Sequence, residues 1–171
     1  MKIIESERLI LRQLMLDDAP FIIELLNDEA FLQNIGDKGV RSLEDARGYI
    51  TDGPAKSYQE HGFGLYLTEL KDGNIPIGIC GLLKRDSLDD VDIGYAFLPE
   101  FCGQGYASES TSAVMDFART KLGIDRVVAV VSEGNAASIR VLEKLGLRFE
   151  KMMRLTDDAD ECMFFTPKES D

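Results

Sequence analysis

Hydrophobic and polar residues alternate in the first part of the chain, which is the pattern of a strand with one covered face. This pattern holds in "RLILRQL" (residues 8–14), and helical spacing follows in "LDDAPFIIELLND" (residues 16–28). A longer segment that begins at Ser42 predicts a second helix or a pair of helices, with its middle left open by two glycines and Pro54. The chain therefore begins with a strand that is followed by helices.

Three further strands are predicted in series. Residues 63–70 and 75–85 flank the sequence "KDGN", and Asp72-Gly73 within it is typical of a hairpin turn. The third strand spans residues 91–98. Consecutive strands joined by short turns predict an antiparallel meander.

The second half of the chain alternates helices with strands. After a glycine-rich turn, one apolar stripe predicts a helix that ends at Gly123; its members are Ala107, Thr111, Val114, Ala118 and Leu122. Residues 126–131 ("RVVAVV") lack alternation, as in a central strand covered on both faces. A short helix is predicted between Asn135 as N-cap and Gly146 as stop, followed by closing strands in residues 147–155 and 161–168. The order predicts a mixed α/β fold.

Length and composition favour one domain over residues 1–171. The 171 residues are 44% hydrophobic, which is enough to bury a core, and no repeat or linker interrupts them. The start lacks the apolar run of a signal peptide, and no segment approaches the ~20 apolar residues of a membrane span. We therefore expect a cytoplasmic protein.

Charge and the rare reactive residues narrow the function further. The formal charge of −12 repels phosphate backbones and anionic membranes, so we expect no nucleic-acid and no membrane partner. Cys80, Cys102 and Cys162 are odd in number and widely spaced, which predicts free thiols rather than disulfides or zinc ligands. The single histidine, His61, argues against a polyhistidine metal site and a Ser-His-Asp hydrolase, and we expect it to be structural or exposed.

The glycine-rich turn lies in "PEFCGQGYASES", residues 99–110. Where a strand enters a helix through Gly103 and Gly105, unpaired N–H groups point outward at the positive end of the helix dipole. A phosphate or diphosphate can bind there. Tyr106 follows Gly105 where a P-loop requires lysine, and Ser108 stands where a dinucleotide fingerprint has its third glycine. A simple tight turn remains the alternative.

A family resemblance extends this interpretation. "IGYAFLPEFCGQGYASES", followed by "NAASIRVLEKLGLRF", resembles the GNAT superfamily of acetyl-CoA-dependent N-acetyltransferases, and within it the RimJ/RimL-type branch. The opening "SERLILRQL" is similar to the first strand of that branch. The resemblance implies a GNAT fold, with a mostly antiparallel mixed sheet splayed between its fourth and fifth strands and helices on both faces. It also implies acetyl-CoA as co-substrate and no metal.

The resemblance also implies how coenzyme A is held. In that family a Q/R-x-x-G-x-G/A loop wraps the diphosphate with backbone amides, and it maps here to residues 102–107, with Cys102 in place of glutamine or arginine. The strand before it holds the pantetheine arm, with the Leu98 amide facing the thioester carbonyl. The implied coenzyme A contacts are Phe97, Leu98, Gly103, Gln104, Gly105, Tyr106, Ala107, Asn135 and Ser138.

Candidate acid and base residues follow from the needs of acetyl transfer. Asn135 and Ser138 match an Asn-x-x-Ser that opens the last helix in this branch, so Ser138 is the candidate proton donor to the thiolate; the alternative is an N-cap followed by a polar first-turn residue. Leu142 occupies the position where many GNAT enzymes have a tyrosine. Asp92 is the candidate base with Asp90 beside it, and a solvated strand end is the alternative for both.

The predicted activity is direct transfer of an acetyl group from acetyl-CoA to a primary amine. The RimJ/RimL-type resemblance makes a protein N-terminal α-amine the first acceptor and small-molecule amines the next. Tyr49, Tyr58 and residues 31–39 fall where the family builds its acceptor pocket. A non-catalytic acyl-CoA-binding regulatory module and a dinucleotide-dependent oxidoreductase are the alternatives. The oligomeric state stays open, a homodimer included.

Overall fold

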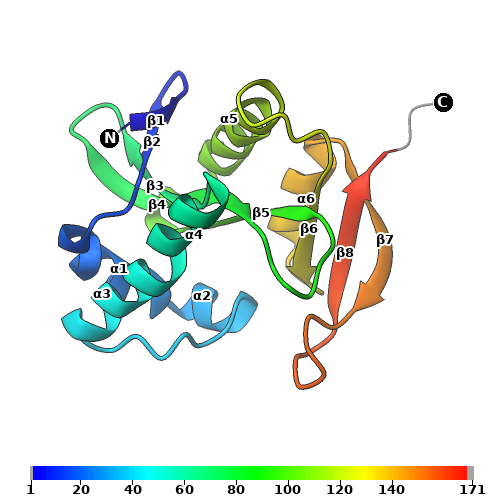
Figure 1. Cartoon of the computed structure of the whole chain (residues 1–171), viewed down its shortest axis with the longest axis horizontal. Coiled ribbons are helices and arrows are strands. Elements are labelled where there is room, and N and C mark those ends of the chain that lie inside the picture. Colours follow the sequence, from blue (N-terminus) through cyan, green and yellow to red (C-terminus); the bar gives the residue numbers. More distant parts are fainter. Residues whose placement is uncertain (1, 169–171) are drawn as a thin grey trace.

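A computed structural model describes residues 2–168, which form one eight-stranded sheet in the order β1-β2-β3-β4-β5-β6-β8-β7 (Figure 1). The strands are β1 (Lys2–Glu5), β2 (Leu9–Arg12), β3 (Leu65–Leu70), β4 (Ile75–Leu83), β5 (Val91–Phe97), β6 (Val127–Ser132), β7 (Leu147–Met153) and β8 (Cys162–Pro167). The helices are α1 (Ala19–Leu26), α2 (Glu29–Asn34), α3 (Leu43–Ile50), α4 (Lys56–His61), α5 (Tyr106–Thr120) and α6 (Ala136–Lys144). The outermost bounds of the predicted domain, residues 1 and 171, lie outside the described residues.

The sheet is antiparallel everywhere except between β5 and β6. These two strands pair in parallel over only two residue pairs, Val91 with Val127 and Asp92 with Val128. Both strands continue beyond these pairs, β5 to Phe97 and β6 to Ser132, without further pairing to each other. The mostly antiparallel sheet with its splay is therefore confirmed. The splayed strands are the fifth and sixth, because β1 precedes the strand that the sequence predicts as the first.

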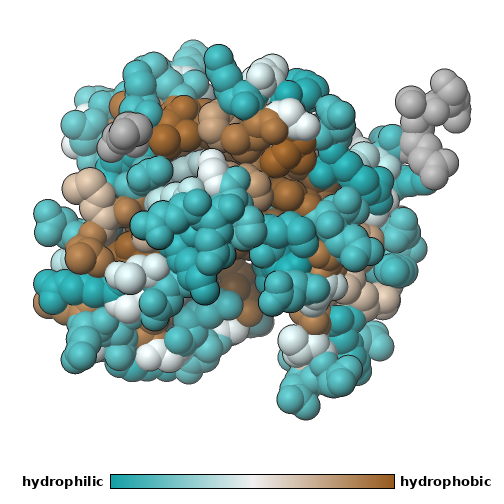
Figure 2. Space-filling view, viewed as in Figure 1, coloured by the Kyte–Doolittle hydropathy of each residue, from teal (hydrophilic) through white to brown (hydrophobic). Residues whose placement is uncertain are grey.

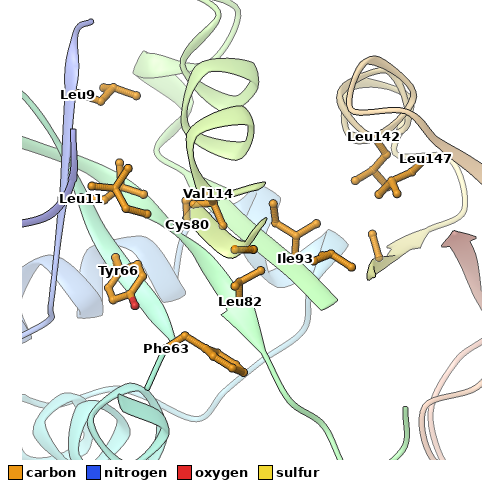
Figure 3. Close-up of a cluster of buried hydrophobic side chains, with 14 of the residues drawn as sticks. Leu9, Leu11, Phe63, Tyr66, Cys80, Leu82, Ile93, Val114, Leu142 and Leu147 are labelled. Carbon is orange, nitrogen blue, oxygen red and sulfur yellow. The ribbon is translucent and has the colours of Figure 1, made fainter. Parts of the chain in front are cut away.

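Helices cover both faces of the sheet, and the alternation along β5 divides its side chains between them. Ile93, Tyr95 and Phe97 pack in the hydrophobic cluster that includes α5 and α6. Ala96 and Leu98 pack in the second cluster, which includes α1, α2 and α3. Figure 3 shows the first cluster, with side chains from the sheet directed toward those of the helices.

Two helical features differ from the pattern of the sequence. Helix α2 was not predicted; it begins because the Asp28 side chain accepts hydrogen bonds from the amides of Ala30 and Phe31. The middle of the second helical segment, which the sequence left open near Pro54, is a widened helical turn, Thr51–Ala55, between α3 and α4. A wide turn of this kind accommodates a proline, which has no amide to donate to the preceding turn.

The face in Figure 2 is mostly hydrophilic, and the three cysteines are unpaired, as the sequence predicts. Figure 2 shows hydrophilic residues over most of one face, with a band of hydrophobic residues beside α5. Cys80 is buried, Cys162 is partly buried and Cys102 is exposed, and all three are free thiols, as predicted. No helix among residues 2–168 is long and apolar enough to cross a membrane.

Candidate active site

The glycine-rich loop connects the end of β5 to the start of α5. A short turn, Pro99–Phe101, follows β5, and the loop then passes through Gly103 and Gly105 before α5 begins at Tyr106. Both glycines have a left-handed backbone, with φ of +78° and +85°. Glycine adopts this conformation without the steric cost that a Cβ atom adds. The two glycines therefore allow the chain to turn tightly into α5.

The amides of this loop face outward without internal partners. Among residues 2–168, the amides of Gly103 to Ala107 donate no hydrogen bond to a protein oxygen, and Glu109 is the first residue whose amide bonds back, to the Gly105 carbonyl at 3.0 Å. A Cβ atom built on Gly103 would meet nothing within 4 Å. Free amides at the positive end of the 15-residue helix α5 fit a diphosphate, which is the chemistry that the sequence implied.

The register of β5 corrects the residue expected to face the thioester. The Leu98 amide donates to the Ile77 carbonyl of β4 at 2.9 Å, so it is not free for a ligand. Since hydrogen-bonding direction alternates along an antiparallel strand, the main-chain groups of Tyr95 and Phe97 face the opposite side, where β6 has diverged. The prediction for Leu98 was therefore wrong by one residue, and Phe97 carries the amide that faces the splay.

The first turn of α6 lies on the other side of the splay. The Asn135 side chain accepts a hydrogen bond from the Ser138 amide at 3.3 Å, which confirms the predicted N-cap. Ser138 is half-buried in this turn. Its carbonyl lies 3.4 Å from the Tyr95 hydroxyl, which donates to it across the gap between β5 and α6. This contact brings the side chain of Tyr95 to Ser138.

Tyr95 is a functional candidate that sequence reasoning missed. Burial raises the pKa of its hydroxyl to about 12, although the hydrogen bond with Ser138 opposes this shift. Its position in β5, two residues before Phe97, was the available signal, because alternate residues of a strand share a face. Leu142, by contrast, is a core residue with 2% exposure, and Figure 3 shows it beside Leu147.

The candidate base Asp92 is fully buried at the paired end of β5. Arg85 Nε lies 3.1 Å and 3.2 Å from its two carboxylate oxygens. Burial raises the pKa of Asp92 to about 6, and the charge of Arg85 opposes the rise. A solvated strand end is therefore wrong for Asp92. Asp90 instead lies before β5, where it forms a partly exposed ion pair with Arg126 at 3.0 Å.

The segment expected to form the acceptor pocket lies near the end of β6, because the Ser132 hydroxyl donates to the Asn34 carbonyl. A cavity of about 600 Å³ adjoins this segment, and its lining includes Lys38, Glu44, Tyr49 and Asp52. Tyr49 therefore lies where a pocket exists.

Tyr58 does not line this cavity. Its hydroxyl accepts from the Leu14 amide at 3.1 Å and donates to the Leu65 carbonyl, and its ring stacks on Tyr66. These contacts give Tyr58 a structural role, which corrects its assignment to the acceptor pocket. His61, at the end of α4, stacks on Phe63 with the ring centroids 5.6 Å apart. No group of three or more metal-ligating side chains occurs among residues 2–168.

The splayed sheet and the amide-lined loop define an acetyltransferase of the GNAT type. The family model described as "Acetyltransferase (GNAT) domain" matches residues 8–148, and the chain belongs to this family, whose members use acetyl-CoA. The chain is 32% identical over 154 residues to the "Uncharacterized N-acetyltransferase YoaA" of Bacillus subtilis (strain 168), covering 89% of this chain and 86% of that protein.

Solved structures share the fold at lower identity. The acetyltransferase from Agrobacterium tumefaciens str. C58 has a TM-score of 0.80 at 23% identity, with 96% of this chain and 93% of that chain covered. RimL, described as a ribosomal L7/L12 alpha-N-protein acetyltransferase in complex with coenzyme A, has a TM-score of 0.80 at 24% identity, covering 94% of both chains. These two likenesses show the shared fold.

Proposed function

We propose that this protein is a single-domain N-acetyltransferase that transfers an acetyl group directly from acetyl-CoA to a primary amine. The observation that carries the proposal is the set of unpartnered amides from Gly103 to Ala107 at the start of α5, next to strands that separate beyond Asp92 and Val128. The loop receives the diphosphate, and the gap between β5 and β6 receives the pantetheine arm.

The residues around the gap have distinct roles in this proposal. Acetyl-CoA supplies the acetyl group as a thioester. The Phe97 amide hydrogen-bonds the thioester oxygen and stabilises the negative charge that develops there. The Ser138 hydroxyl donates a proton to the departing sulfur, and the Tyr95 hydroxyl bonds the Ser138 carbonyl. Asn135 holds the first turn of α6 in place through its cap.

Asp92 is the proposed base, and it accepts the amine proton through a water molecule at the paired end of β5. A pKa of about 6 leaves the carboxylate mostly ionised at neutral pH while keeping it basic enough to accept a proton. Its partner Arg85 holds the carboxylate in one orientation through two contacts to Nε. The amine then enters the reaction uncharged.

The first acceptor to test is a protein N-terminal α-amine, as in the RimJ/RimL-type branch. Support comes from the motif in residues 102–107 and 135–138 and from the fold shared with RimL, which is described as acting on ribosomal L7/L12. The cavity beside Tyr49 is the proposed place of the acceptor, whether a peptide end or a small amine. We place the reaction in the cytoplasm.

The test is an acceptor panel with acetyl-CoA as donor. Peptides with free N-termini are compared with the same peptides blocked at the N-terminus, and polyamines and amino sugars are included. Thiol release gives the rate, and mass spectrometry locates the added acetyl group on the amine. Coenzyme A binding without turnover on any amine would instead favour the non-catalytic module.

A further inference from the structure

One side chain from the turn between β1 and β2 reaches the glycine-rich loop. Arg8 Nη1 donates to the Gln104 carbonyl at 3.0 Å, across 96 residues of sequence. The guanidinium carbon lies 4.4 Å from the centroid of the Tyr106 ring, in a cation–π contact. Arg8 Nη2 lies 3.3 Å from the place where a Cβ atom on Gly105 would stand. A single arginine therefore contacts Gln104 and Tyr106 and lies beside Gly105 between them.

The same arginine is paired with a carboxylate in the first turn of α5. Glu109 accepts hydrogen bonds from the Arg8 amide at 2.8 Å, from Arg8 Nε at 2.7 Å and from the Ser6 hydroxyl. Burial alone raises the pKa of Glu109, but these hydrogen bonds outweigh it and lower the pKa below its usual value. Glu109 is therefore ionised at neutral pH, one helical turn from the loop amides.

An ionised carboxylate at this place opposes an anionic ligand, since like charges at short range repel. The pairing of Glu109 with Arg8 offsets that repulsion. Cys102, at the first position of the loop motif, supplies no cation; its sulfur contacts the carbonyls of Phe97 and Leu98 at 4.0 Å and 3.6 Å. The positive charge at the loop comes instead from Arg8, just before β2.

We propose that Arg8 is a positioning residue for coenzyme A. It holds the Gln104–Tyr106 backbone in the shape that presents the free amides, and it cancels the charge of Glu109 beside the diphosphate. This inference rests on the proposed function, in which the loop binds coenzyme A. It predicts that Arg8 governs affinity for the diphosphate end of the ligand and leaves the chemical step alone.

The first test measures the Kd of coenzyme A by calorimetry, which requires no acceptor amine. We expect Arg8→Ala to weaken binding about tenfold or more, as expected for loss of a charge-assisted interaction, and Arg8→Lys to give an intermediate value. The matched control is Arg119→Ala, which removes an arginine paired with Asp116 at the other end of α5. Wild-type affinity in Arg8→Ala would overturn the proposal.

The second test separates the ligand effect from general damage. With acetyl-CoA, kcat/KM of Arg8→Ala falls about tenfold through KM, whereas with S-acetylpantetheine, which lacks the diphosphate, kcat/KM equals that of the wild type. An equal loss with both donors would show a folding defect and overturn the proposal. Glu109→Gln added to Arg8→Ala is expected to restore part of the affinity for coenzyme A, because the unbalanced carboxylate is removed.

The two proposals fail in different ways. A wild-type protein that binds coenzyme A but acetylates no amine contradicts the proposed reaction, and the Kd comparison for Arg8 still stands. A wild-type protein that acetylates an amine, together with an Arg8→Ala variant of unchanged Kd, contradicts the role of Arg8 alone.

Discussion

Arg85 and Asp92 form an ion pair in which the carboxylate is fully buried and both of its oxygens lie within 3.2 Å of Arg85 Nε. Burial gives Asp92 a pKa of about 6 in the folded protein, above the ordinary 3.8 of an aspartate. The folded state therefore binds this proton more tightly than the unfolded chain does. The resulting stability is fully present below about pH 4 and is lost as the pH rises through about 6.

Asp92→Asn should remove this pH dependence of stability. The quantity to compare is the difference in free energy of unfolding, wild type minus Asp92→Asn. This difference should fall by on the order of 2–3 kcal/mol as the pH rises from about 4 to about 8. Urea denaturation across this range measures it. Asp90→Asn is the control variant, because Asp90 lies in a partly exposed pair with Arg126. A constant difference for Asp92→Asn would contradict the shifted pKa.

Asp92→Asn also tests the proposed base. The wild-type kcat/KM should rise with pH through about 6, since the carboxylate must be ionised to accept a proton. Asp92→Asn should lower kcat about 10²-fold or more, as expected for loss of a general base, with a smaller change in the Kd of coenzyme A. Initial rates on the best amine of the panel measure both. Unchanged kcat would remove Asp92 from the mechanism.

Ser138→Ala and Tyr95→Phe separate the two hydroxyl groups at the splay. If Ser138 donates the proton to the departing sulfur, Ser138→Ala should lower kcat about 10²-fold with little change in KM for acetyl-CoA. Tyr95→Phe keeps the ring and loses only the contact to the Ser138 carbonyl, so it should cost less. A larger loss in Tyr95→Phe than in Ser138→Ala would transfer the acid role to Tyr95.

Tyr95 has a separate consequence for the pH profile. Its pKa of about 12 means that its hydroxyl keeps its proton throughout the range in which rates are measured. If kcat fell as the pH rose toward about 10, and this fall were absent in Tyr95→Phe, the pKa of about 12 would be contradicted.

Local patterns in the sequence predicted most of the elements and the coenzyme loop. The Asp72-Gly73 turn fixed the hairpin of β3 and β4, and the apolar run in residues 126–131 marked a central strand, because both signals arise within a few residues. The glycines at 103 and 105 predicted a loop with free amides, because their left-handed backbone is a local requirement.

Features that depend on register or on distant contacts were missed. Whether the amide of Leu98 or that of Phe97 faces the splay depends on the register in which β5 pairs with β4. This register cannot be read from the sequence. The contacts of Arg8 with the loop cross 96 residues, so no local pattern contains them. Tyr58 looked like a pocket residue because the sequence does not show where its hydroxyl bonds.

Alanine at the two loop glycines should weaken coenzyme A binding to different degrees. Both positions require positive φ, which costs an alanine roughly 1–2 kcal/mol. At Gly103 a Cβ meets nothing, whereas at Gly105 it also approaches Arg8 Nη2 at 3.3 Å, so Gly105→Ala should lose more affinity. Gly123→Ala is the control, because it has φ of +68° and open space at the far end of α5.

Calorimetry and thermal unfolding together distinguish strain from ligand binding. All three alanine variants should lose similar stability, but only the two loop variants should raise the Kd of coenzyme A. Equal binding in Gly103→Ala, Gly105→Ala and wild type would contradict the assignment of the loop to the diphosphate.

Gly81 and Gly94 are direct neighbours across β4 and β5, yet alanine should be tolerated at only one of them. A Cβ atom on Gly81 would lie 2.0 Å from the Gly64 carbonyl oxygen and 2.9 Å from Leu65 Cα, so the backbone itself must move. On Gly94 the nearest atom is Leu83 Cδ1 at 3.2 Å, the end of a flexible side chain. Gly81→Ala should therefore cost about 3 kcal/mol or more in free energy of unfolding, and Gly94→Ala about 1 kcal/mol or less. Urea denaturation of both variants measures this, and equal losses would contradict the close approach of β4 to the segment that leads into β3.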